Sequence, residues 1–339
     1  MAYITGTALS LADLVSVIHA ACVSNGWTLA GNVLSKSGCF AEVMLANNGE
    51  TGAPPNGNVR VRVGNGIDGS NELVDTPSGH GLLGPLRAAS GTSYPDWDWP
   101  ATYHIHVLDA PDEVYVMVNY EGGLRWQNLA FGRSPAPGNA GTGNWFSSMM
   151  GRIGRTDIYR TVNHFNFGPH GSLIHGSQGN MGGPAFFFSF TGANSTNSNL
   201  GSQMHGAFDD SNGSVPAWSS ETNWFSGLAN ERMASGIAGN GELLAYQPSA
   251  ANFASVLVRC QIIQRRPEQK TSLIGELRHL RWIRNDFISD GDVLTLGPDR
   301  WKVYPMHRRE PAARNANNGA VSRLDHSGTM AMAIRYDGP

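Results

Sequence analysis

The sequence contains few cysteines. Its 339 residues include only three, Cys22, Cys39 and Cys260, which lie far apart and form no CxxC pair. This spacing argues against a zinc site and against a disulfide framework. We therefore expect the three cysteines to be buried free thiols.

Charge and long apolar runs are scarce as well. Charged residues make up 15% of the chain and the formal net charge is -3, so the sequence lacks the basic character of a dedicated nucleic-acid-binding protein. No run approaches the roughly 18 apolar residues that a membrane-spanning helix needs. The N-terminal stretch MAYITGTALSLADLV lacks the basic region of a signal peptide. We expect synthesis in a cytoplasm, no membrane span and no sequence-specific nucleic-acid partner.

Familiar catalytic signatures are also missing. The sequence has no GxSxG elbow, Walker loop, HExxH motif or dinucleotide fingerprint. Ser172 and His175 lie close together in a glycine-rich stretch, but their spacing says nothing of the third group that orients a triad. The segment 209–213 lacks the alternating ligands of a calcium loop. The sequence therefore predicts a protein that is not an enzyme and holds no cofactor.

Glycine is abundant, with 42 residues, and proline contributes 18, which indicates a chain rich in turns and strands. Ser10 and Asp13 mark the start of one helix, whose apolar residues follow helical spacing until Asn25 and Gly26. Short apolar segments then indicate a meander of strands, including an alternating strand at 59–63 with one wet face. Three further antiparallel strands are expected at about 102–108, 113–120 and 124–131.

These patterns predict a β-rich α+β fold with antiparallel sheets, one N-terminal helix and long ordered loops rich in glycine, serine and asparagine. Three regions are expected. Residues 1–133 form the helix and an antiparallel β domain, residues 134–250 form a loop-rich insertion, and residues 251–339 form a C-terminal β segment that completes the core. Within the last region, the segment 272–284 fits either a short helix or an irregular strand pair.

The stretch GPDRWKVYPMHRRE, residues 297–310, is either a basic site or the turn and second strand of a hairpin. Proline at the second position of a turn over residues 297–300 favours the hairpin. Trp301 and Val303 would then point to one face, and Lys302 and Tyr304 to the other. Arg308 and Arg309 follow the end of this strand, so we expect them at the surface, in contact with a neighbouring subunit.

Charge is unevenly distributed along the chain. Residues 259–339 contain twelve Arg and two Lys against nine Asp or Glu, a net charge of +5, and the first 258 residues carry -8. Only Lys36, Lys270 and Lys302 are lysines. Arginine tolerates burial at interfaces better than lysine does, so the excess suggests contact surfaces, although genome composition explains it equally well.

Two sets of side chains are candidates for binding sites. His104 and His106 project from the same face of a strand, so they could share a metal ion, or they could be two polar residues on a solvent face. Trp97 and Trp99, in the sequence DWDW, could form an aromatic sugar platform or buried anchors at a subunit contact.

Several segments give the chain a family resemblance: TYHIHVLDAPDEVYVMVNY, LAFGRSPAPGNAGTGNWF, LTLGPDRWKVYPMHRRE and the ending HSGTMAMAIRYDGP. They resemble virion structural proteins encoded among the tail and morphogenesis genes of tailed bacteriophages and prophages. The resemblance implies a β-rich subunit of a tail, baseplate or neck, located in the virion and made in the bacterial host cytoplasm. Its partners would be copies of itself and other virion structural proteins, and it would need no cofactor.

The alternative is a virion protein that binds a receptor or a host surface glycan. It predicts exposed aromatic platforms at loop tips, formed by tryptophans such as Trp97, Trp99, Trp145, Trp218 and Trp224.

Overall fold

The computed structural model of the chain describes residues 1–46, 57–74, 76, 80–84, 97–120, 122–123, 125–134, 142–148, 150–152, 185–187, 202–204, 257–266, 270–284, 288–305 and 330–339. These residues form antiparallel sheets and a single helix near the N-terminus. The predicted β-rich fold with an N-terminal helix is therefore confirmed. Arg308, Arg309 and most of the predicted insertion at 134–250 lie outside the described residues.

Helix α1 spans Leu11–Val23 and begins where the sequence predicts. The backbone N–H of Asp13 donates to Oγ of Ser10 at 3.1 Å, and the carboxylate of Asp13 accepts from the N–H of Leu9 at 2.8 Å. These two bonds satisfy amides that have no partner within the helix. The buried face of the helix consists of Leu11, Leu14, Ile18, Ala21 and Cys22.

The central sheet contains the three strands that the sequence predicts between residues 102 and 131. Its order is β1 (Ala2–Ala8), β9 (Ala101–Leu108), β10 (Glu113–Tyr120), β11 (Arg125–Arg133), β12 (Asn144–Ser148), β14 (Ala185–Phe187) and β15 (Ser202–Met204). Strand β1 was not predicted, and it pairs with β9 along its whole length. The last three strands lie in the predicted insertion and extend this sheet.

A second sheet contains the predicted meander. Its order is β13 (Met150–Arg152), β8 (His80–Leu83), β5 (Val59–Gly64), β4 (Cys39–Leu45), β3 (Val33–Lys36) and β2 (Thr28–Ala30), and a small hairpin joins β6 (Gly66–Ile67) to β7 (Leu73–Val74). The prediction that Arg60 lies on a solvent-exposed face of β5 is wrong, because its side chain is buried. Its guanidinium donates to the buried carboxylate of Glu42 at 2.7 Å, and this charge pairing makes the burial tolerable.

The third sheet is C-terminal and has the order β16 (Val258–Arg266), β17 (Lys270–Arg284), β20 (Met330–Arg335), β19 (Asp299–Pro305) and β18 (Val293–Leu296). The ambiguous segment 272–284 is thus a strand. The final segment of the chain completes the sheet, as predicted. Trp301 and Val303 belong to its apolar cluster, with Ile283, Ile288, Ala331 and Ala333.

The turn of the β18–β19 hairpin lies one residue earlier than predicted. Leu296 pairs with Asp299, so Gly297 and Pro298 are its two central residues. Gly297 has a φ of 60°, which a hairpin turn with glycine at its first central position requires. Proline therefore occupies the third turn position, because glycine supplies the left-handed conformation before it.

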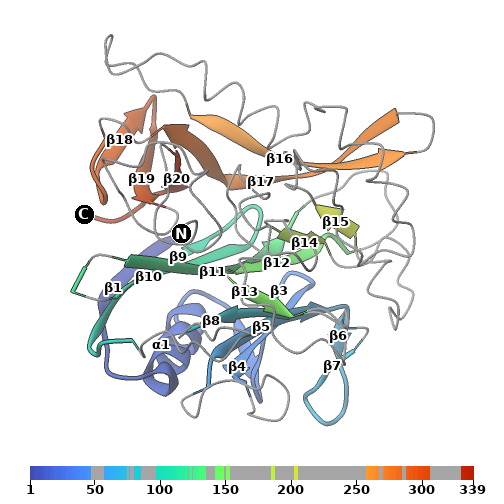
Figure 1. The fold of residues 1–339 in the computed structure, drawn as a ribbon. Helices are drawn as coiled ribbons and strands as arrows, with labels where there is room; N and C mark the ends of the chain where they lie inside the picture. The colour runs from blue at the N-terminus through green and yellow to red at the C-terminus, as the bar shows by residue number, and fades with distance from the viewer. Residues whose placement is uncertain are drawn as a thin grey trace, which may run out of the picture.

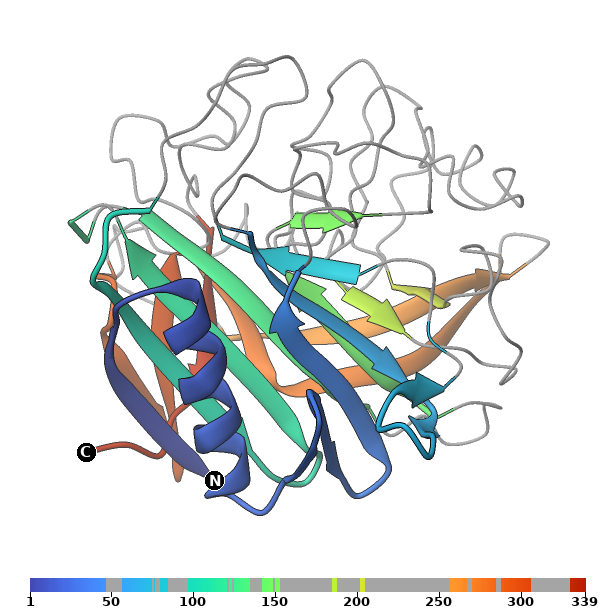
Figure 2. The ribbon, with the colours of Figure 1, turned by 90° about the horizontal axis from the view of Figure 1, so that it is seen from below.

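The sheets stack in three layers, with the central sheet in the middle (Figure 1). Its valine-rich face packs against helix α1 and the second sheet in the main apolar core, which includes Ile105, Val107, Val116 and Val118. Figure 2 shows α1 lying across this face beside β4 and β5. The opposite face carries polar and aromatic side chains, and the C-terminal sheet covers it.

Two of the cysteines confirm the prediction of buried free thiols. Cys22 and Cys39 are both free and fully buried. Burial raises the pKa of the Cys22 thiol to about 12, so this group stays protonated and unreactive near neutral pH. The side chain of Cys260 lies outside the described part of the chain.

Candidate functional site

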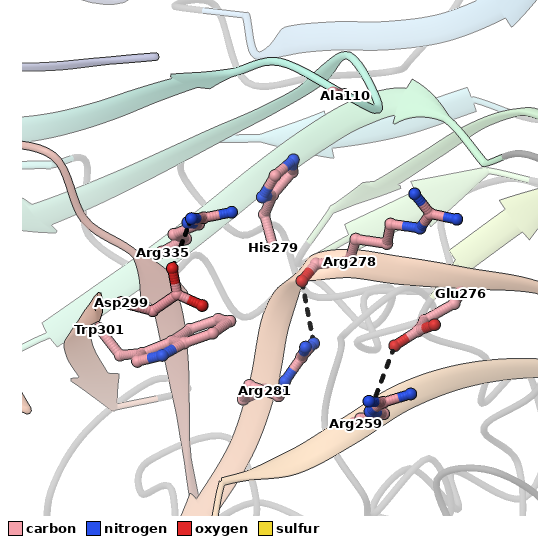
Figure 3. Close-up of a pocket in the computed structure, with 9 residues that line it drawn as sticks. All are labelled: Ala110, Arg259, Glu276, Arg278, His279, Arg281, Asp299, Trp301 and Arg335. Atoms are coloured by element: carbon pink, nitrogen blue, oxygen red, sulfur yellow. Dashed lines mark hydrogen bonds and ion pairs between the residues drawn. The ribbon is translucent and has the colours of Figure 1, made fainter. Parts of the chain in front are cut away.

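The C-terminal sheet carries a pocket with a volume of about 420 Å³ (Figure 3). Strands β16, β17, β19 and β20 supply most of its walls, and Ala110 in the β9–β10 turn of the central sheet closes one side. The pocket therefore lies where the central and C-terminal sheets meet. The charged and polar side chains around it are Arg259, Glu276, Arg278, His279, Arg281, Asp299 and Arg335, together with Trp301.

An irregularity in β17 shapes this pocket. Cys260 of β16 pairs with Leu277, but the preceding Arg259 pairs with Arg281, so residues 278–280 form a bulge. A bulge leaves backbone groups without partners in the ladder and turns side chains to new directions. Here it brings Arg278, His279 and Arg281 to the pocket within four consecutive residues.

A buried carboxylate of the central sheet binds the amides that the bulge releases. Oε1 of Glu113 accepts from the N–H of Arg278 at 3.0 Å, and Oε2 accepts from the N–H of His279 at 3.1 Å. The hydroxyl of Tyr115 donates to the same Oε2 at 2.7 Å. Glu113 is fully buried, and this desolvation raises its pKa to about 7 despite the three hydrogen bonds. Glu113 thus connects the bulge of β17 to the central sheet by hydrogen bonds.

Ion pairs occupy two sides of the pocket. Arg335 donates to the carboxylate of Asp299 on one side, and on the other Nε of Arg259 lies 3.8 Å from the carboxylate of Glu276 (Figure 3). Four arginines against two carboxylates leave the lining with an excess of two positive charges, because His279 is neutral. The pocket is therefore electropositive.

Arg278 in the bulge and Arg281 directly after it differ in their contacts from Arg259 and Arg335, which form ion pairs. Arg281 donates through Nη1 to the carbonyls of Arg278 and Leu280 at 2.9 and 2.8 Å, and its guanidinium lies 4.7 Å from the ring centre of Trp301. These contacts fix its orientation. The guanidinium of Arg278 is exposed and has no hydrogen bond or ion pair to any residue that the structure describes. Its donors are available to a ligand.

His279 and Trp301 bring further polar atoms to the lining. His279 is 2% exposed, its Nε2 donates to the carbonyl of Pro111 at 3.2 Å, and burial lowers its pKa to about 4. Its Nδ1 and the Nε1 of Trp301 are both buried without a hydrogen-bond partner within the described ranges. Such atoms are rare in folded proteins and usually have a functional or structural reason.

The predicted site residues His104 and His106 lie elsewhere, between the central and C-terminal sheets. His106 is fully buried, so the interpretation of a solvent face is wrong for this residue. Its Nδ1 lies 3.1 Å from the carbonyl of Arg335, which can only accept, so Nδ1 carries the hydrogen. The Nε2 atom of the neutral ring then accepts from the hydroxyl of Tyr304 at 2.8 Å. Both nitrogens that could bind a metal are thus engaged.

His104 is half-buried beside this pair. Its Nδ1 shares a hydrogen bond of 2.6 Å with the hydroxyl of Tyr3, and its ring stacks on Trp126. Burial lowers the pKa of His104 to about 4 and that of His106 to about 3, so both rings are neutral near pH 7. The described residues contain no group of three His, Cys, Asp or Glu placed to hold a metal ion. The geometry is that of a structural network joining two sheets.

The tryptophans of the DWDW segment lie against the main core. Trp97 is 4% exposed and stacks on Tyr120 with ring centres 4.5 Å apart, so the prediction of an exposed platform or subunit anchor is wrong for it. It is buried because β10 offers an aromatic partner on the apolar face of the central sheet. Trp99 is half-buried and packs on the same core. Trp145 is fully buried, and Trp218 and Trp224 lie outside the described residues.

The pocket was not predicted, although one signal pointed to its region. The positive balance of residues 259–339 indicated a basic C-terminal sheet. Which arginines converge could not be deduced, because the bulge in β17 and the fold of β20 beside it determine this. Nothing local distinguishes Arg278 from the other arginines of the same segment.

Comparisons with known proteins identify no relative, so the site is interpreted from its geometry. A scan against protein-family models gives no match, and a search of curated proteins gives no similar sequence. Within the described ranges, the helix is neither long nor apolar enough to cross a membrane.

Proposed function

We propose that this protein is a structural subunit of a tailed-bacteriophage particle, in the tail, baseplate or neck, and that it acts by assembling with copies of itself and with other virion proteins. It would be made in the cytoplasm of a bacterial host and would reach the virion during assembly. The described structure supports this proposal through the way in which it uses its polar residues and distributes its charge.

The observation that carries the proposal is the separation of charge between two parts of the sequence. The first 258 residues carry a net -8 and residues 259–339 a net +5, and the arginine-lined pocket opens in the C-terminal sheet of the basic region. Surfaces of opposite charge on one subunit favour contacts between unlike faces of successive copies. Such heterologous contacts build rings and tubes, which are the forms of a tail or neck.

The buried polar groups support the same proposal. The network around His106 and the carboxylate of Glu113 both connect the central sheet to the C-terminal sheet. These groups fix the relative position of two layers, which a subunit under load in a particle needs. The segments that resemble virion proteins include β9, β10, β18, β19 and β20, which form or cover this junction.

The glycan-binding alternative has less support in the described residues. Trp97 and Trp145 are buried in the chain's own interior, so neither can form a sugar platform. Trp301 beside the pocket is 3% exposed and has Arg281 over its ring.

The experiment that tests the proposal is the location of this chain in purified particles. A structural subunit is present in each particle in several copies arranged by its symmetry. A chain that acts outside the virion remains in the cell lysate when the particles are purified.

A further inference from the structure

From the arginine-lined pocket we infer a binding site for an oxyanion group of the carboxylate or phosphate class. This inference goes beyond the proposed function, because it concerns the chemistry of one pocket and holds whether or not the protein belongs to a particle. It rests on the free guanidinium of Arg278, the charge balance of the lining and the rigid support of the side chains.

The chemistry of the lining selects for an anion with more than one acceptor oxygen. A guanidinium presents several N–H donors in one plane, which match the paired oxygens of a carboxylate or phosphate. The lining has an excess of two positive charges, and Arg278 extends on the side of the pocket where Glu276 lies, away from the Arg335–Asp299 pair (Figure 3). An anion there would be attracted by the excess charge and would find donors without displacing the Arg335–Asp299 pair.

The pocket is also organised before a ligand arrives. Arg281 is fixed by two carbonyl acceptors and by Trp301, and the bulge that carries Arg278 is held by the carboxylate of Glu113. Because the Arg281 side chain and the backbone that carries Arg278 are already ordered, less entropy is lost on binding and more of the interaction energy appears as affinity. The volume of about 420 Å³ accommodates a phosphate or the acidic side chains of a polypeptide.

Two sources can supply this chemistry, a free phosphate-type anion or the carboxylates of an acidic polypeptide segment. Calorimetric titration of the 339-residue chain with inorganic phosphate and, separately, with a short polyglutamate peptide distinguishes them. Chloride at matched ionic strength controls for general screening. Saturable binding of phosphate alone identifies a small-anion site, and saturable binding of the peptide that phosphate displaces identifies a site for an acidic segment.

Substitutions at Arg278 link the binding to this pocket. Arg278→Gln should weaken the affinity roughly tenfold or more, as expected when a charge-assisted hydrogen bond is lost. Arg278→Lys keeps the charge but loses the planar fork, so its affinity should lie between those of the wild type and Arg278→Gln. Arg133→Gln removes one positive charge from an exposed arginine outside the pocket and should leave the affinity unchanged.

The inference would be overturned by the absence of saturable binding of both anions, or by equal affinities of the wild type and Arg278→Gln. A loss of affinity in Arg133→Gln as large as in Arg278→Gln would overturn it too, because the attraction would then be general and not that of this pocket. The two Arg278 variants should keep the thermal melting curve of the wild type, since the Arg278 side chain is exposed. Arg133→Gln should lower the melting temperature, because Arg133 donates to the carbonyls of Ser37 and Thr142, and its affinity is therefore measured well below that temperature. Failure of this test leaves the proposed virion role standing, since that role is tested in particles.

Discussion

The hydroxyl of Tyr304 donates a hydrogen bond to Nε2 of His106 at 2.8 Å, although 198 positions separate the two residues. His106 lies in β9 of the central sheet and Tyr304 in β19 of the C-terminal sheet, so this bond joins two layers of the molecule. The other ring nitrogen of His106 donates to the carbonyl of Arg335 in β20. One histidine of the central sheet therefore binds two strands of the sheet that covers it.

Replacement of Tyr304 by phenylalanine should show the value of this bond. Tyr304→Phe keeps the ring but leaves the buried Nε2 of His106 without a donor, so the free energy of unfolding should fall by about 1–3 kcal/mol. Denaturation by urea measures this change. The double variant His106→Leu/Tyr304→Phe should lose less than the sum of the two single changes, because each single change already breaks the bond. Strict additivity would mean that the bond contributes nothing.

Trp301 is predicted to be an anchor of the C-terminal sheet. It is 3% exposed and packs in the cluster with Ile283 and Val303, so Trp301→Ala should lower the free energy of unfolding by about 3–5 kcal/mol through lost burial and a cavity. Leu296→Ala in the paired strand β18 is the matched control. Leu296 is 60% exposed, and its loss should change the stability by less than about 0.5 kcal/mol. Similar effects of the two substitutions would contradict the assigned faces of the hairpin.

Glu113 should make the stability depend on pH between about 4.5 and 7. Burial raises its pKa in the folded state to about 7, above the ordinary value of 4.5. The folded state therefore binds more protons than the unfolded state in this window, and the free energy of unfolding contributed by this group falls as the pH rises through it. The free energy of unfolding of the wild type, relative to that of Glu113→Gln, should therefore fall as the pH rises from about 4.5 to 7.

The difference in the free energy of unfolding between the wild type and Glu113→Gln reports on Glu113 alone, because the other carboxylates titrate in both proteins. Denaturation curves of the two proteins at pH 4.5, 6 and 8 measure this difference. Glutamine should also be destabilising in itself, because its amide nitrogen would replace an oxygen that accepts from backbone N–H groups or from Tyr115. A difference that stays constant from pH 4.5 to pH 8 would show that the folded-state pKa is not raised.

The local parts of the fold could be predicted from the sequence. Alternation placed Trp301 and Val303 on the apolar face and Tyr304 on the opposite face of β19, and the cap at Ser10 gave the start of the helix. The turn of the hairpin was predicted one residue too late. The prediction put Pro298 at the second turn position, whereas the structure puts Gly297 there, because glycine adopts the positive φ that the turn requires.

Relationships between distant segments could not be predicted. Arg60 appeared to face water, since its sequence neighbours alternate, but Glu42 in the next strand pairs with it in the interior. His104 and His106 suggested a metal site or a solvent face, because the sequence does not show that the C-terminal sheet covers them. Only the fold brings such partners together.

Arg308 and Arg309 lie outside the described residues, and their predicted role in a subunit contact remains a prediction. Replacing both by glutamate should leave the melting temperature within a few degrees of the wild type, since exposed charges contribute little to stability. Incorporation into particles should fail, because like charges would then meet across the contact. Complementation of a particle-forming system that lacks the wild-type chain, with the melting curve as control, separates these effects. Normal incorporation of the double variant would contradict the assigned contact.

The proposal of a virion structural subunit is tested most directly by purified particles from the system that encodes this chain. Quantitative mass spectrometry of the particles, with a low-resolution map in which the chain is located, gives its presence, copy number and position together. The account predicts several symmetry-related copies in the tail, baseplate or neck of every particle. Particles that form normally and contain no copy of the chain would contradict it.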